Sequence, residues 1–478
     1  MALPAFASGE EPITRPHLDQ NTGARSVSLR GRAYTNLGLV GAGQVSASAI
    51  DFLGDTLGSF SSLQIAPGSW KRVGDRYEGV LWTLPDRGRN DPAANLFFDY
   101  PARLERFRVR FTPKDGRVEI VPDGGIELRD FRGKPFTGAD PDGGTLTERG
   151  ILLPAPARGT GQGKVSFDAE SLQFTRDGSF YVGDEYTANV YYFDPHGRLR
   201  GVIQPPAAIV PRRKGQPYFG SLKAPDTGRR NNQGPEGMSL SPDGRTLFVA
   251  LQSALMQDSA TGNAAGRTDT RVLAYDVSRT PTPMQPSAHY VMQLPAYNDA
   301  GNGQAPNRTA AQSEIRAIDN HRFLMLARDG AGRGADGSAP IVYKSVLLVD
   351  IAGATNLAGT EYETGTASIL QSPDNTMLKP QIVPAERIEL INMLNPAQLG
   401  HFGLTVEPGT GQISEKWEAM DLVPVLDPEH PSDYFLFVGN DNDFVARKCR
   451  MSGQPCDSEI DNENRVLVYR LRLPTPLR

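Results

Sequence analysis

The sequence predicts an all-β protein, a six-bladed β-propeller of four-stranded antiparallel blades with long inserted loops. Three observations predict it: many turn residues, a hairpin motif that recurs along the chain, and a strongly β-prone strand after each hairpin turn. The 478 residues include 50 Gly and 38 Pro, and 38% are hydrophobic. This composition indicates many turns between short strands and argues against a helical bundle.

The recurring motif has a Glu in a short alternating strand, then a turn, then a second strand that ends in a polar cluster. "AESLQFTRDGSFYVGDE" from Ala169 and "PEGMSLSPDGRTLFVALQ" from Pro235 show it most clearly, and further copies start at Ser313 and Trp417. The Asp-Gly pairs are typical of hairpin turns, because Gly adopts a positive φ at little steric cost. A third strand follows most copies. A fifth copy without the Glu, "YEGVLWTLPDRGRND", precedes the others.

Meander repeats of this length predict a propeller, and division of the chain by a typical repeat favours six blades. We expect residues 31–478 to form a single propeller domain. Residues 1–30 are expected to contribute to its closure, and the final strand, in "RVLVYRLRL", to share a blade with N-terminal residues.

The motif acids are expected to gather at one mouth of the propeller channel, because the first strand of every blade starts at the same face. The converging glutamates are Glu170, Glu236, Glu314 and Glu418. The polar clusters that end the next strands return to that mouth: Asp86, Arg87, Asp184, Glu185, Gln252, Arg328, Asn440, Asp441 and Asp443. Two interpretations of the glutamates stay open: they bind a cation, or each accepts hydrogen bonds from the backbone of a neighbouring blade.

Charge and missing motifs narrow the function. The net charge is -5, so the chain lacks the overall positive charge that nucleic acids and anionic membrane surfaces usually require. The sequence contains no stretch of about 18 apolar residues, the length that a membrane-inserted segment needs. The sequence has no G-x-S-x-G, H-E-x-x-H, P-loop or dinucleotide-binding motif. We therefore expect a small-molecule substrate; the oligomeric state is not predicted.

The two cysteines and the N-terminus point to the secretory pathway. Cys449 and Cys456 lie in one loop with Gly and Pro, where a short disulfide is feasible and a metal site would lack partners. "AFAS" near the N-terminus is similar to the tail of a small-residue cleavage site, and Asn307 begins a glycosylation sequon. We expect a secreted protein whose leader is absent from this sequence.

As a set, the motifs resemble the phytase-like, or "esterase-like activity of phytase", β-propeller family, particularly its secreted fungal branch. The resemblance spans roughly residues 40–470 and rests on "DAESLQFTRDGSFYVGDEY", "NNQGPEGMSLSPDGRTLFVALQSALMQD", "YKSVLLVDIAGATNL", "EKWEAMDLVP" and "DYFLFVGNDNDF". It implies six blades and acid-lined central sites for calcium, a hard cation that prefers oxygen ligands. We expect a structural more than a catalytic cation and no organic cofactor, with these metal ligands: Glu170, Glu236, Glu314, Glu418 and Asp441.

Some fungal members that the chain resembles are pericyclases of secondary metabolism. They catalyse hetero-Diels–Alder coupling of a tropolone o-quinone methide to a humulene-type sesquiterpene alkene. This activity is the leading functional prediction, and proximity and orientation would supply most of the catalysis. It assigns catalytic roles to Arg87, Asp184, Glu185, Gln252, Arg328 and Asn440, and substrate contacts to Asp86, Leu255, Met256 and Asp443. For each arginine, an inter-blade salt bridge is an equally open interpretation.

Two other functions stay open. One is a calcium-dependent phosphoester or carboxylester hydrolase, in which Arg87, Arg328 and the basic loop 211–232 could bind phosphate. The other is a non-catalytic secreted propeller that binds a ligand. An apolar central pocket would favour the pericyclase, and an open basic cleft would favour the hydrolase. A channel filled by side chains would favour the binding protein.

Overall fold

The computed structural model describes residues 12–259 and 264–477, and it confirms the all-β class. The helices of the described residues are short: η1 (Met256–Asp258), η2 (Ala264–Gly266), α1 (Glu361–Thr364) and α2 (Pro396–His401). None of them is long and apolar enough to cross a membrane. The "AFAS" stretch, residues 5–8, lies outside the described residues.

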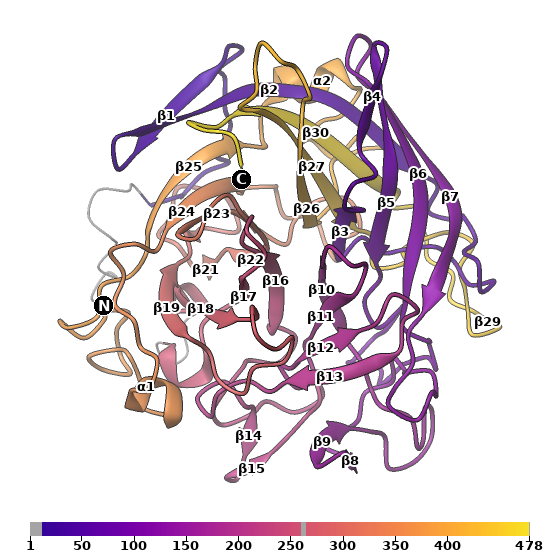
Figure 1. Ribbon diagram of the computed structural model, residues 1–478, viewed down its shortest axis with the longest axis vertical. Helices are drawn as coiled ribbons and strands as arrows, with labels where there is room; N and C mark the ends of the chain where they lie inside the picture. The colour runs from indigo at the N-terminus through magenta and orange to yellow at the C-terminus, as the bar shows by residue number, and fades with distance from the viewer. Residues whose placement is uncertain (1–11, 260–263, 478) are drawn as a thin grey trace.

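Most of the described strands fall into five strand sets of four antiparallel strands each (Figure 1). The first set contains β3 (Ser62–Ile65), β5 (Arg76–Leu84), β6 (Arg103–Thr112) and β7 (Arg117–Glu127), with β4 (Lys71–Val73) paired to β5. The second contains β10 (Ala169–Phe174), β11 (Phe180–Asp184), β12 (Val190–Phe193) and β13 (Leu199–Ile203). The third contains β16 (Pro235–Leu240), β17 (Thr246–Leu251), β18 (Asp269–Asp276) and β19 (Ala288–Gln293).

The fourth and fifth strand sets follow the same pattern. The fourth contains β22 (Ala311–Ala317), β23 (Arg322–Arg328), β24 (Lys344–Asp350) and β25 (Glu386–Asn392). The fifth contains β26 (Lys416–Pro424), β27 (Asp433–Asp441), β30 (Asn464–Arg472) and β2 (Arg32–Val45), with β1 (Arg25–Leu29) paired to β2. Short hairpins decorate the loops: β8 (Thr145–Glu148) with β9 (Ile151–Pro154), β14 (Arg212–Arg213) with β15 (Gln216–Pro217), β20 (Ala296–Tyr297) with β21 (Arg308–Thr309), and β28 (Arg450–Met451) with β29 (Gln454–Pro455).

The predicted number of six blades is not confirmed, because the described strands make five sets. The fifth set takes its outer strand β2 from the N-terminal part of the chain, where it pairs with β30. The loops at 351–385 and 393–415 lengthen the chain without adding a strand set, so chain length alone does not fix the number of sets. The boundary at residue 30 between the closing segment and a single domain stays a prediction.

One parallel pair, Ala42 opposite Arg117, joins the first and fifth sets into a 10-stranded sheet. The pair lies between β2 and β7, the last strands of their sets. The two sets are therefore in contact at their outer strands as well as through their first strands.

The first strands of the five sets lie against one another in cyclic order: β3, β10, β16, β22, β26 and again β3. Polar side chains on these strands bind the backbone of the next set. Gln64 accepts from the N–H of Phe174 at 2.7 Å, and Gln173 accepts from the N–H of Leu240 at 3.0 Å. Such bonds satisfy backbone groups that no neighbouring strand pairs. Two further bonds of this kind link Ala317 N to Ser239 Oγ and Ile65 N to Asp421 Oδ2.

Arg316, on β22, connects all the other first strands. Its guanidinium donates to Leu63 O at 2.9 Å on β3, to Met238 O at 3.0 Å on β16 and to Met420 O at 2.6 Å on β26. It also donates to Gln173 Oε1 at 3.2 Å on β10. The side chain is only 5% exposed, so these bonds form away from solvent. A single guanidinium thus fixes the five strands around the middle of the molecule.

Apolar side chains fill the space between neighbouring strand sets. One core cluster packs Phe107 and Leu81 of the first set against Phe437 and Val468 of the fifth. Another packs Leu104 of the first set against the aromatic residues of the second. Each sheet is covered on both faces, so every residue of β24 is buried. The sequence of β24 accordingly contains an uninterrupted apolar stretch instead of an alternating pattern.

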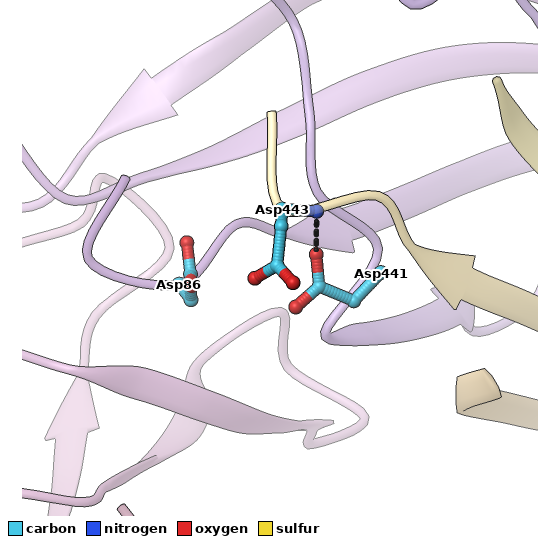
Figure 2. Close-up of side chains that lie close together, drawn as sticks. All are labelled: Asp86, Asp441 and Asp443. Carbon is cyan, nitrogen blue, oxygen red and sulfur yellow. Dashed lines mark hydrogen bonds between the residues drawn. The ribbon is translucent and has the colours of Figure 1, made fainter. Parts of the chain in front are cut away.

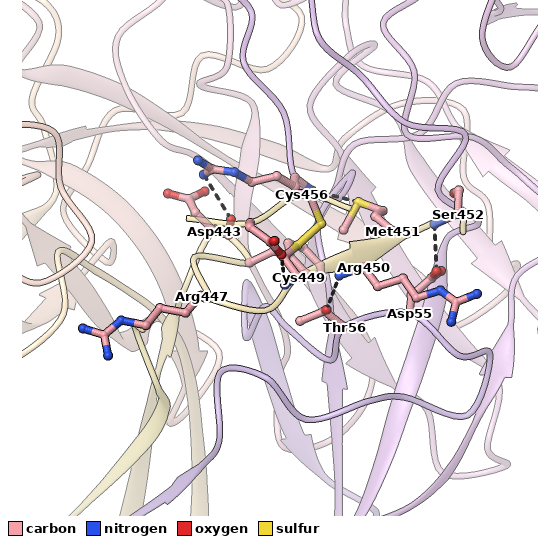
Figure 3. Close-up of a disulfide and its surroundings, with 12 residues drawn as sticks. Asp55, Thr56, Asp443, Arg447, Cys449, Arg450, Met451, Ser452 and Cys456 are labelled. Atoms are coloured by element: carbon pink, nitrogen blue, oxygen red, sulfur yellow. Dashed lines mark hydrogen bonds between the residues drawn. A yellow bond between two sulfur atoms is a disulfide. The ribbon is translucent and has the colours of Figure 1, made fainter. Parts of the chain in front are cut away.

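The predicted disulfide between Cys449 and Cys456 is confirmed (Figure 3). It closes the β28–β29 hairpin, which lies against the segment before β3. Arg450 N donates to Thr56 Oγ1 at 2.7 Å, and Ser452 N donates to Asp55 Oδ1 at 2.7 Å. The disulfide loop thereby links the chain after β27 to the first strand set.

Replacement of Arg316 by Met should destabilise the protein. The change leaves buried carbonyls and the Asp421 carboxylate, 3.2 Å from the guanidinium, without their donor, which typically costs about 3–5 kcal/mol. Chemical denaturation measures the free energy of unfolding. Arg32→Met, at an exposed position of β2, is the control and should change stability by less than about 0.5 kcal/mol. Equal stabilities of the two variants would contradict the role given to Arg316.

Candidate functional site

A β-bulge near the start of four first strands aims one side chain out of the regular pleat. The pairing register shifts at Glu170 on β10, at Glu236 on β16 and at Glu418 on β26. A bulged residue has no partner on the neighbouring strand, so its side chain is free to turn toward the middle of the molecule. Three of the four predicted glutamates therefore share one backbone geometry.

The fourth predicted glutamate, Glu314, stands one position later than the other three. The bulge of β22 falls on Ser313, and Glu314 already pairs with Leu326. Its carboxylate accepts from Ser62 Oγ at 2.6 Å and from Met238 N at 3.1 Å, so it bonds to the first and third strand sets. Burial raises the pKa of Glu314 to about 7. This is the backbone-binding role that the sequence left open for every glutamate.

A polar cavity of about 370 Å³, here called the central pocket, lies where the bulged residues point. Six residues with carboxylates line it: Asp86, Glu170, Glu236, Glu418, Asp441 and Asp443. Three basic residues line it: Arg87, Arg328 and Lys416. Five amides complete the wall: Asn90, Asn231, Asn232, Gln233 and Gln252. The remaining lining residue is Ala311, so the pocket is almost wholly polar.

Most of the predicted site residues meet in this pocket, and a few do not. Glu185 lies just behind the lining, whereas Asp184 binds its own turn through Thr187 N at 3.0 Å. Asn440 joins β27 to β30 by accepting from Arg465 N at 2.5 Å. Two predicted substrate contacts lie elsewhere, because Leu255 is buried in an apolar core and Met256 is half-buried beside Gly228.

Each basic residue of the central pocket already has an acidic partner. Arg87 Nη1 lies 2.6 Å from Asp168 Oδ2, and Arg328 forms an ion pair with Glu418. Arg328 also donates to Ser313 Oγ at 3.2 Å, the hydroxyl that occupies the bulge where the other strands have Glu. Both arginines thus form the inter-set salt bridges that the sequence left open.

Lys416 balances a second group of acids at the pocket wall. Its ammonium lies 2.7 Å from Asp443 Oδ1 and 3.5 Å from Asp441 Oδ2. Figure 2 shows these two aspartates beside Asp86, and the three offer oxygens within 4.8 Å of one another. Burial, and then the nearby Asp443, raise the pKa of Asp86 to about 7.

Glu170, Glu185 and Glu236 form a group at the pocket in which no member makes a salt bridge with a described residue. One oxygen from each lies within 4.8 Å of the others. Glu185 Oε1 accepts from Gly234 N at 2.7 Å and Glu236 Oε1 accepts from Gln252 Nε2 at 2.8 Å. Their second oxygens, Glu185 Oε2 and Glu236 Oε2, are buried without a hydrogen-bond partner. We call these three residues the unpaired glutamates.

The environment of Glu170 and Glu236 opposes their ionisation. Burial, and then the neighbouring carboxylates, raise the pKa of Glu170 and of Glu236 well above the ordinary value. Buried carboxylate oxygens without donors are costly unless a proton or a cation compensates them. Carboxylate oxygens suit a hard divalent cation such as Ca²⁺, so the donor set fits the predicted metal. Of the predicted ligands, Glu170 and Glu236 lie together with Glu185, and Asp441 lies with Asp86 and Asp443, so the full predicted ligand set stays a prediction.

Sequence reasoning missed several lining residues. Lys416, in the lining, and Asp168, the salt-bridge partner of the lining residue Arg87, each stand two positions before a motif glutamate, and that spacing could have identified them. Asn231, Asn232 and Gln233 come from the loop before β16, and no periodicity marks them.

The comparisons with known proteins identify the family of the chain. The family model called Phytase-like, "Esterase-like activity of phytase", matches residues 57–444, and the chain belongs to this family. An uncharacterized secreted protein of Arthroderma benhamiae is 33% identical over 461 residues, which cover 87% of this chain and 88% of the relative.

Two solved structures show only weak similarity. A chain from the S. cerevisiae complex of Dbp5 with Nup159 and Gle1 is 8% identical, with a TM-score of 0.29 over 97% of this chain and 98% of that one. A protein of unknown function from Bacteroides caccae is 11% identical, with a TM-score of 0.22 over 60% of this chain and 89% of that one. Neither likeness informs the fold or the site.

Calcium should stabilise the protein more at high pH than at low pH. Without a cation, the native state keeps protons on Glu170 and Glu236 that the unfolded state releases above the ordinary pKa of 4.5, so stability falls as the pH rises beyond it. A calcium ion bound to the ionised carboxylates would oppose this loss. We expect the calcium-induced rise in melting temperature to be larger at about pH 8 than at about pH 5. At a calcium concentration of 100 times the dissociation constant, the free energy of unfolding should increase by about 2.7 kcal/mol.

Two isosteric variants locate the cation. Glu236→Gln should abolish the calcium-induced rise in melting temperature. Glu418→Gln should keep that rise while lowering the melting temperature with or without calcium, because Arg328 loses its partner. A calcium response of Glu236→Gln equal to that of the unmodified protein would contradict the assignment to the unpaired glutamates.

Proposed function

We propose that the protein is a secreted, divalent-cation-dependent hydrolase of carboxylic esters, with its active site in the central pocket. The observation that carries this proposal is the group of unpaired glutamates beside a small polar cavity. Calcium is the cation that we propose for this group.

We also propose that the five strand sets are the blades of a five-bladed β-propeller. The cyclic contact of β3, β10, β16, β22 and β26 supports it, as do the bonds from Arg316 to the other first strands. In such a fold the channel mouth collects residues from every blade. The central pocket takes lining residues from β10, β16, β22 and β26 and from the loop after β5.

The lining of the central pocket favours water as the nucleophile. It contains no Ser, Thr, Cys or His, the usual residues that would form a covalent intermediate with an ester. A divalent cation, when bound, would polarise the ester carbonyl and make water a better nucleophile. Asp86 lines the pocket and forms no salt bridge with a described residue, so its carboxylate is available to accept a proton.

The charge of the pocket favours a carboxylic ester over a phosphoester. Six acidic and three basic residues line it, and the basic residues are already paired. One divalent cation would leave the lining negative overall, which disfavours a substrate with several negative charges. The basic loop 211–232 contributes no free guanidinium to the lining, which instead receives the amides of Asn231 and Asn232 from it.

The hetero-Diels–Alder pericyclase stays a prediction from the family resemblance. That reaction requires apolar walls around two apolar partners, whereas the central pocket has Ala311 as its one apolar lining residue. Binding of a ligand without catalysis also stays open, and the assay below distinguishes it from hydrolysis.

Secretion is supported by two observations. The relative from Arthroderma benhamiae carries the word secreted in its name. The disulfide between Cys449 and Cys456 suits an oxidising compartment, because cytosolic thiols are kept reduced.

Hydrolysis of p-nitrophenyl acetate tests the proposed function. We expect calcium-dependent release of p-nitrophenol, loss of activity with a chelator, and little hydrolysis of p-nitrophenyl phosphate. Glu170→Gln and Glu236→Gln should lower kcat/KM by at least about 100-fold per folded molecule. Glu386→Gln, at an exposed position of β25, is the control and should keep full activity.

Activity that survives the chelator per folded molecule would make the ion structural and remove it from the mechanism. Absence of hydrolysis, together with faster coupling of a hydroxylated tropolone precursor to a humulene-type alkene, would overturn the proposal in favour of the pericyclase.

A further inference from the structure

A second cavity of about 630 Å³, here called the rim groove, lies beside the central pocket. Half of its lining residues have apolar side chains: Phe97, Ala139, Pro141, Pro156, Ala157 and Leu222. They come from the loop after β5, from the segments before β8 and after β9, and from the loop before β16. The rim groove is thus larger and more apolar than the central pocket.

One layer of side chains separates the two cavities. The Arg87 guanidinium, which lines the central pocket, lies 5.8 Å from the centroid of the Phe97 ring, which lines the rim groove. Arg87 Nη1 also donates to Ser221 Oγ at 3.3 Å, and Ser221 precedes the groove residue Leu222. A small molecule bound at Arg87 is therefore next to the groove.

The acidic groups of the rim groove are already bonded within the protein. Asp140 Oδ2 accepts from Ser221 N at 2.7 Å and from Ser221 Oγ at 2.6 Å. Asp142 forms an ion pair with Lys223 at 2.8 Å. These acids therefore need no ligand, whereas the apolar surface of Phe97 and Leu222 remains half-exposed. Apolar surface next to a polar catalytic pocket suits the apolar part of a substrate.

We propose that the rim groove binds the acyl chain of an ester whose carbonyl lies in the central pocket. This inference rests on the proposed function and adds the substrate class: esters of medium-chain acids rather than acetyl esters. Removal of each methylene from water improves affinity about fourfold. Burial of only two methylenes thus gives a preference of more than about tenfold for a longer chain.

Binding of two neutral amides tests the groove without any need for hydrolysis. The probes are N-methyloctanamide and N-methylacetamide, which share the polar head and differ in the chain. We expect N-methyloctanamide to bind the calcium-loaded protein more than about tenfold more tightly by calorimetry. Ala157→Trp fills the groove from an exposed position and should abolish this preference. Ala339→Trp, exposed on another loop, is the matched control and should keep it.

Hydrolysis of p-nitrophenyl octanoate and p-nitrophenyl acetate gives an independent readout. The octanoate should have the higher kcat/KM, and Ala157→Trp should remove that advantage, whereas Ala339→Trp should keep it. Chain-length-dependent binding without hydrolysis of either ester would keep the groove and overturn the proposed function. Equal binding of the two amides, or a preference that Ala157→Trp retains, would overturn the groove.

Discussion

The arrangement of the five strand sets depends on the hydrogen bonds that the Arg316 side chain donates to the other first strands. The sets are separate sheets apart from the single pair between β2 and β7, so backbone ladders alone do not hold them in a ring. The guanidinium supplies five donors in a rigid fork, enough to reach a group on each of the other first strands. The bulged residues can face one cavity because these strands are fixed relative to one another.

The central pocket illustrates how pairing of charges distinguishes structural residues from candidate functional ones. Arg87, Arg328 and Lys416 each offset an acid of another segment, so these pairs stabilise the wall. The unpaired glutamates lack such a partner among the described residues, and they are the place where the fold leaves a chemical requirement unmet. Natural proteins tolerate unfavourable groups mainly where function needs them.

The sequence predicted the all-β class, the disulfide and most of the pocket residues, because turn chemistry and two-residue periodicity are local signals. It did not predict the shift of Glu314, since a bulge at Ser313 rather than at the glutamate depends on how β22 pairs with β23. The number of strand sets was also not predictable from length, because β2 completes the set of β26, β27 and β30 from the far end of the chain. The amides of the 231–233 loop had no pattern to reveal them.

Ser313 also breaks the symmetry of the ring. Ser313 has a small hydroxyl where the other bulges have a carboxylate, and Arg328 donates to that hydroxyl. The basic residues of the pocket therefore come from the first, fourth and fifth sets, and the unpaired glutamates come from the second and third. The cavity is consequently asymmetric, because ion pairs line one side and carboxylates without a salt bridge line the other. A guest with two chemically different ends would meet different surroundings at each end, so the wall itself distinguishes one orientation of the guest from the reverse.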